Sequence, residues 1–66
     1  MTADELLRRL RRRRDITIIR SRGKGGHVRV ERGDRVTRVP TASGEFKTGL
    51  LRGILGQLGL SIGDLR

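Results

Sequence analysis

The stretch HVRVERGDRVTRV, residues 27–39, decides the fold of this chain. Polar and apolar residues alternate on either side of Gly33-Asp34, a pattern typical of two antiparallel strands joined by a two-residue turn. With this turn at the tip, residues whose numbers sum to 67 face each other, for example Val28 and Val39. The sequence therefore predicts strands over residues 27–31 and 35–39, and Pro40 is expected to stop the second.

This register divides the hairpin into two faces. Successive side chains of a strand point to opposite faces, so a slip of one residue would exchange the two sets. We assign to the core the face that holds Val28, Val30, Thr37 and Val39. The other face holds His27, Arg29, Glu31, Val36 and Arg38.

The residues before the hairpin predict a helix, a strand and a turn. Thr2 and Glu5 have the spacing of a capping box, and Leu6, Leu7 and Leu10 follow at helical spacing, which predicts a helix over residues 3–13. The β-branched run over residues 15–20 predicts another strand, and residues 21–26 predict a turn.

The residues after the hairpin predict a second helix with Thr48 as its N-cap. Its apolar stripe is expected in the core and consists of Leu50, Leu51, Ile54, Leu55 and Leu58. Gly59 stands where a helix often ends in a left-handed residue, and Leu60 can make the accompanying apolar contact. Phe46 is expected in the core near the start of this helix. Residues 61–66 form a short tail with room for one further turn.

The predicted fold class is α+β, in the order α-β-β-β-α. Two one-sided helices cover one face of a three-stranded antiparallel sheet and leave the other face open. The register places His27, Arg29 and Arg38 on that open face. A chain of 66 residues is expected to form one domain, residues 1–66, with a small core.

The composition indicates the class of partner. Sixteen Lys and Arg against seven Asp and Glu give a formal net charge of +9, which favours a polyanion such as nucleic acid. The absence of cysteine excludes disulfides and thiolate zinc sites. The single aromatic residue, Phe46, argues against base stacking on aromatic side chains. No apolar run suits a secretory signal or a membrane span, so we expect a cytoplasmic protein without a membrane partner.

The one histidine, His27, follows a basic, glycine-rich turn. Imidazole exchanges protons near neutral pH, so it can take the proton of an RNA 2′-OH and start cleavage to a 2′,3′-cyclic phosphate and a 5′-OH. Nearby cations and glycine N–H groups can hold the phosphate. The candidate RNA-binding residues are Arg20, Arg22, Lys24, Gly25, Gly26, Arg29 and Arg38.

This site predicts slow, sequence-relaxed cleavage, because one histidine serves as base and Lys24 or solvent must protonate the leaving oxygen. We expect no metal and no small-molecule cofactor. The seven carboxylates are scattered along the chain, and one histidine cannot make a zinc site.

Three blocks of the chain, GKGGHVRV at 23–30, RVTRVP at 35–40 and KTGLLRGILGQLGL at 47–60, together resemble the HicA family of toxins. These are small mRNA interferases of type II toxin–antitoxin systems, with a fold like that of double-stranded-RNA-binding domains. The resemblance implies ribosome-independent cleavage of mRNA with His27 in the catalytic position. It also implies a HicB-type antitoxin that masks the His27 face. Gly26 stands where the family commonly has serine.

Other interpretations remain open at this point. A similar fold could be a non-catalytic module that binds double-stranded RNA or another nucleic acid, with His27 merely exposed. The arginines at 8–9 and 11–14 could form an RNA-binding patch or a solvated helix face. A basic amphipathic helix acting on membranes is the weakest option, because the first helix offers three leucines.

Overall fold

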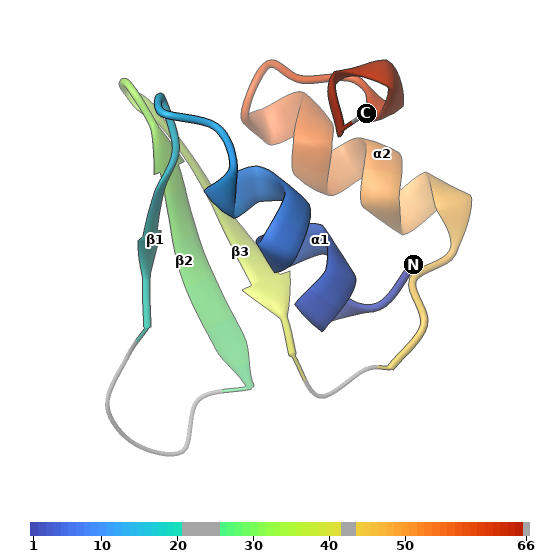
Figure 1. The fold of residues 1–66 in the computed structure, drawn as a ribbon. Helices are drawn as coiled ribbons and strands as arrows, with labels where there is room; N and C mark the ends of the chain where they lie inside the picture. The colour runs from blue at the N-terminus through green and yellow to red at the C-terminus, as the bar shows by residue number, and fades with distance from the viewer. Residues whose placement is uncertain (21–25, 42–43, 66) are drawn as a thin grey trace.

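Helices and strands follow one another in the predicted order, α-β-β-β-α, and a short 3₁₀ helix is added at the end. The computed structural model describes residues 1–20, 26–41 and 44–65. The elements are α1 (Ala3–Arg11), β1 (Thr17–Ile19), β2 (His27–Arg32), β3 (Arg35–Pro40), α2 (Thr48–Gln57) and η1 (Ile62–Leu65). The strands form one antiparallel sheet in the order β1-β2-β3. Both helices lie on the same side of this sheet (Figure 1).

The predicted register of the hairpin is confirmed. Val28 pairs with Val39, Arg29 with Arg38 and Val30 with Thr37. The ladder is longer than predicted at both ends, since Arg32 pairs with Arg35 and His27 with Pro40. Pro40 is thus the last residue of β3 rather than a stop before its end, which an edge strand tolerates because its outer N–H groups need no partner.

The first strand is shorter than residues 15–20, since β1 pairs with β2 over three residues, Thr17–Ile19. Asp15 lies outside this ladder, and its carboxylate accepts hydrogen bonds from the side chains of Arg13 and Arg32. The first helix is also shorter than predicted: α1 ends at Arg11 with Arg12 as its C-cap, and Arg13, which follows, donates a side-chain hydrogen bond to Asp15. The N-cap is confirmed: the Glu5 N–H donates to Thr2 Oγ1 at 3.3 Å.

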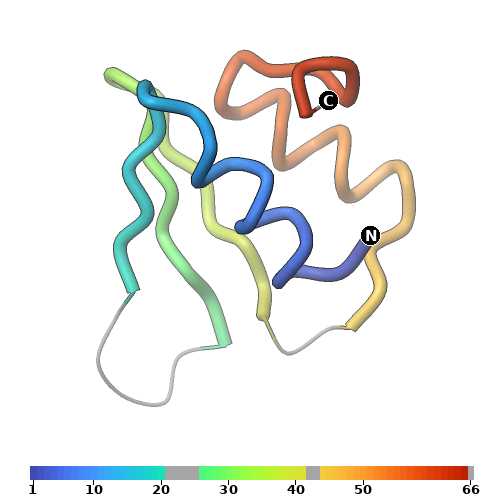
Figure 2. The backbone as a smooth tube through the Cα atoms, in the orientation of Figure 1, coloured from blue at the N-terminus to red at the C-terminus, as the bar shows by residue number. Residues whose placement is uncertain are grey.

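The core lies between the helices and the predicted inner face of the hairpin. Its fully buried side chains are Leu6, Leu7, Leu10, Val30, Val39, Leu55 and Leu58. Phe46 is also buried, as expected, and its N–H donates to the Met1 carbonyl at 2.7 Å, so the N-terminus runs beside the segment that precedes α2 (Figure 2).

Leu50 is the exception to the predicted apolar stripe, since it is 46% exposed. At about 100° per residue, Leu50 lies about 90° away from the centre of the stripe formed by Leu51, Ile54, Leu55 and Leu58. These four are buried, and Leu50 remains on the flank of α2.

The two ends of α2 differ from each other. The prediction that Thr48 caps the helix is wrong, because Lys47 is the N-cap and makes no side-chain cap hydrogen bond. The C-terminal end closes as predicted, with Gly59 at φ +71°. The Leu60 N–H donates to the Leu55 carbonyl at 2.8 Å, and the Gly59 N–H donates to the Gly56 carbonyl at 3.0 Å. These two backbone hydrogen bonds form the pattern of a Schellman motif.

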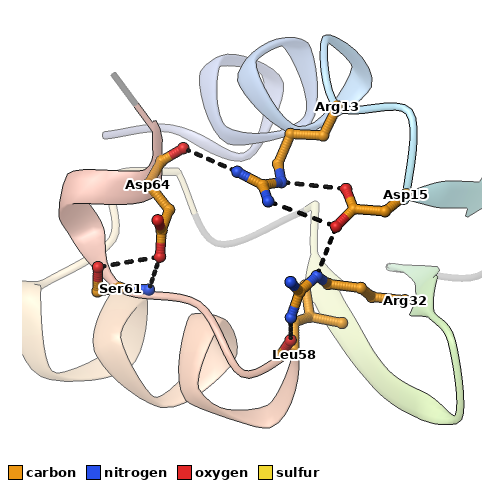
Figure 3. Close-up of polar contacts among 6 residues, drawn as sticks. All are labelled: Arg13, Asp15, Arg32, Leu58, Ser61 and Asp64. Carbon is orange, nitrogen blue, oxygen red and sulfur yellow. Dashed lines mark hydrogen bonds and ion pairs between the residues drawn. The ribbon is translucent and has the colours of Figure 1, made fainter.

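A polar network joins the end of α1, the hairpin and the C-terminal segment (Figure 3). Arg32 Nε donates to Asp15 Oδ2 at 2.8 Å, and its Nη1 donates to the Leu58 carbonyl at 2.9 Å. Arg13 donates to Asp15 and to the Asp64 carbonyl. The hydrogen bonds from Arg32 and then Arg13 lower the pKa of Asp15 from 3.8 to about 2. The network holds the carboxyl end of α2 against the hairpin.

Candidate functional site

His27 begins β2, and its side chain is exposed on the face of the sheet opposite the helices. The burial of β2 alternates accordingly, with Val28 and Val30 buried and His27 and Arg29 exposed. In the described part of the chain, no helix or strand packs on this second face. We call it the open face, and it carries Thr17, Ile19, His27, Arg29, Glu31, Val36 and Arg38.

The two arginines of the open face are in different electrostatic situations. Arg29 and Arg38 are paired across the strands, where like charges repel. Arg29 is drawn to Glu31, with Nη2 at 2.7 Å from Oε2. Arg38 has no ion pair among the described residues. Arg38 is therefore the arginine of this face whose charge is available to a bound anion.

His27 and Arg38 line the same groove. His27 faces Pro40 in the register, so Arg38 is its diagonal neighbour on the adjacent strand. Such diagonal positions lie about 7–8 Å apart, which is within reach of a long side chain. The groove measures about 500 Å³, and its lining residues are His27, Val36, Thr37, Arg38, Pro40, Leu50 and Gln57. Because the groove is lined by residues from both faces of β3 and by residues of α2, it runs along the outer edge of β3.

A hydrogen bond between β3 and α2 lies at the helix side of this groove. The hydroxyl of Thr37, which is 3% exposed, donates to Gln57 Oε1. This bond satisfies a buried hydroxyl and fixes the orientation of the Gln57 amide. The groove thus has an imidazole and a guanidinium on the sheet side and a positioned amide on the helix side.

The predicted site residues fall into three groups. His27, Arg29 and Arg38 share the open face, and the groove brings His27 and Arg38 together. Arg20 is exposed next to the end of β1. The Gly26 carbonyl accepts the Thr41 N–H at 2.6 Å, just beyond the last ladder pair, His27 and Pro40. The remaining three lie outside the described residues and are Arg22, Lys24 and Gly25.

Sequence reasoning missed two groove residues from α2. Leu50 was assigned to the core, and only its offset from the apolar stripe could have indicated exposure. Gln57 carries no local signal, because its place in the groove depends on how α2 packs against β3. Val36 was placed on the correct face, but its contribution to a concave surface was not foreseen.

Two arginines are engaged elsewhere, Arg13 of the run at 11–14 and Arg32 of the hairpin. Both belong to the network around Asp15, so their guanidinium groups are not available to a ligand on the open face. Within residues 1–20, 26–41 and 44–65, no three His, Cys, Asp or Glu side chains gather closely enough to hold a metal ion. None of the helices described has the length and apolarity to cross a membrane.

Comparisons with protein-family models, with curated proteins and with solved structures return no match to this chain. Function is therefore inferred from the residues and geometry of the groove and the open face.

Proposed function

We propose that this chain is a ribonuclease toxin of the HicA kind, in which His27 is the acid–base group for metal-independent cleavage of mRNA. The observation that carries the proposal is the exposure of His27 on the open face, at a groove that also holds Arg38. The α-β-β-β-α order that the residue patterns predict is also the order of this fold, and the proposal is compatible with it.

The chemistry uses the nucleophile that RNA already carries. The imidazole of His27 accepts the proton of a 2′-OH, and the 2′-oxygen bonds to the adjacent phosphorus as the bond from phosphorus to the 5′-oxygen breaks. The leaving oxygen takes a proton from solvent or from Lys24, which lies outside the described residues. A positioned base contributes about 10²–10⁴-fold of rate. Arg38 stabilises the negative charge that builds up on the phosphoryl oxygens.

The test is cleavage of a 5′-labelled RNA by purified protein in the presence of EDTA. His27→Ala is expected to lower the rate at least about 100-fold. Thermal unfolding should change little because the side chain is exposed, and RNA should still bind through the arginines of the open face. Thr17→Ala, which alters another exposed residue of the open face, is the matched control and should cleave like the wild type. Equal cleavage by wild type and His27→Ala would overturn the proposal.

The second part of the proposal is a HicB-type antitoxin that masks the His27 face. A face with exposed cations and exposed apolar residues, among them Ile19 and Val36, suits a protein partner that supplies carboxylates and apolar side chains. The product of the adjacent reading frame, added in equimolar amount, is expected to stop cleavage. An adjacent product that neither binds the protein nor inhibits it would contradict this part.

The second candidate is a non-catalytic nucleic-acid-binding module. It is favoured by a second basic surface, a groove of α1 and the C-terminal segment that Arg8, Arg9 and Arg12 line together with Glu5 and Leu65. None of these three arginines forms an ion pair within the described residues, so all can meet phosphates. Wild-type protein that binds RNA but yields no cleavage product would identify this function.

A further inference from the structure

The groove along β3 has apolar walls. Three large apolar side chains of the described residues are strongly exposed, namely Ile19 (42%), Val36 (41%) and Leu50 (46%). Val36 and Leu50 line the groove together with Pro40, and they come from opposite sides of it, β3 and α2. Scattered exposed apolar residues need no explanation, but apolar side chains gathered in a concavity suit a ligand.

A hydrogen-bond donor is fixed at the same groove. Because Gln57 Oε1 accepts from the Thr37 hydroxyl, the two N–H groups of its amide are left to donate elsewhere. They have no acceptor among the described residues. The groove contains no carboxylate, and its charged and titratable lining residues are Arg38 and His27. The groove therefore suits a ligand that combines an apolar body, a hydrogen-bond acceptor and a negative charge.

We propose that this groove binds the nucleobase next to the phosphate that is cleaved, an inference that rests on the proposed function. The apolar faces of a base contact Val36 and Leu50, an acceptor atom on its edge receives the Gln57 N–H, and its phosphate lies at Arg38 and His27. Every RNA base has apolar faces and at least one edge acceptor. The groove therefore requires a base without selecting one, which gives affinity with little sequence preference.

The test uses an uncleavable dinucleotide, 2′-O-methyl-uridylyl-adenosine, and its two versions that lack one base each. The probes are titrated into the protein while the NMR signals of the Leu50 methyl groups and the Gln57 side-chain amide are followed, with inorganic phosphate as a further arm. We expect saturable shifts of both signals with the dinucleotide and a loss of these shifts with one of the two abasic versions. Phosphate alone is expected to leave the Leu50 methyl signals unchanged.

Three variants distinguish binding in the groove from binding elsewhere on the open face. Leu50→Ala changes no charge and is expected to weaken dinucleotide binding about tenfold. Gln57→Glu keeps an acceptor for the Thr37 hydroxyl but removes the donor, so it too should weaken binding. Ile19→Ala is the matched control, because Ile19 is similarly exposed on β1 but does not line the groove. It should bind like the wild type.

The outcomes distinguish this inference from the proposed function. Equal affinity of Leu50→Ala and wild type, equal losses in Leu50→Ala and Ile19→Ala, or equal Leu50 shifts with phosphate and dinucleotide would each overturn the base site. If RNA cleavage depends on His27 while one of these results holds, the base site alone is wrong. If the dinucleotide binds as expected but RNA is not cleaved, the groove is a nucleotide site and the ribonuclease proposal is wrong.

Discussion

Gly59→Ala and Gly53→Ala are expected to change stability in opposite directions, although both add one methyl group to an exposed glycine. Gly59 has φ +71°, a conformation that costs an L-residue about 1–2 kcal/mol. A Cβ at this position would lie 3.0 Å from Arg35 Nε and 3.3 Å from Arg32 Nη1. Arg35 can move aside, but Arg32 is held by its bond to the Leu58 carbonyl at 2.9 Å.

The free energy of unfolding should therefore fall by about 1–2 kcal/mol in Gly59→Ala, and more if the bond from Arg32 to Leu58 is lost. Gly53 lies inside α2, and a Cβ there would meet no atom within 4 Å. Alanine is the better helix former by about 1 kcal/mol, so Gly53→Ala should raise the free energy of unfolding by up to that amount.

The assay is urea and thermal unfolding followed by circular dichroism at neutral pH. In a domain of this size, about 1 kcal/mol corresponds to a shift of about 4–8 °C in Tm, downward for Gly59→Ala and upward for Gly53→Ala. Gly59→Asn should lose less than Gly59→Ala, because asparagine visits the left-handed region more readily. A Gly59→Ala protein as stable as the wild type would refute the reasoning about the end of α2.

Three further predictions concern the network, the open face and the core. Asp15 has a folded pKa of about 2, below its ordinary 3.8, so its contribution to stability is complete above the ordinary value and is lost as pH falls towards 2. Urea unfolding at several pH values should show this loss, and in Asp15→Asn the free energy of unfolding should depend less on pH. Arg38→Ala is expected to weaken RNA binding more than Arg29→Ala, because Glu31 already neutralises Arg29. It should also reduce the steepness of the plot of log affinity against log salt concentration by about 1. Anisotropy titrations at several salt concentrations measure both quantities, and equal effects of the two variants would contradict this assignment. Leu10→Ala is expected to lower the free energy of unfolding by about 2–5 kcal/mol, because Leu10 is fully buried, and a loss below 1 kcal/mol in urea unfolding would show that the site collapses around the smaller side chain.

The central hairpin shows how far local pattern can determine a fold. Alternation on both sides of Gly33-Asp34 was sufficient to predict which side chains of β2 and β3 face the core. A two-residue turn leaves one register, and a slip by one residue would bury the charged set instead of the valines. The exposure of His27 followed from the same reasoning.

Long-range contacts were beyond the reach of the same reasoning. Asp15 was interpreted as the start of a strand, but it bonds Arg32, which lies 17 positions away in the chain. Leu50 has the residue type of a core position, yet its direction on α2 leaves it exposed. Gln57 has no pattern around it and bonds Thr37 across 20 positions.

The sequence by itself determined the α-β-β-β-α order, the register of the hairpin and the face that carries His27, because each depends on residues close together in the chain. Only the tertiary structure decided that His27 shares a groove with Arg38, Leu50 and Gln57, and that Arg13 and Arg32 are engaged with Asp15. These relations depend on the direction in which α2 crosses the edge of β3 and on where the chain ends pack. Those features arise from the balance of all core contacts at once, which local periodicity does not encode.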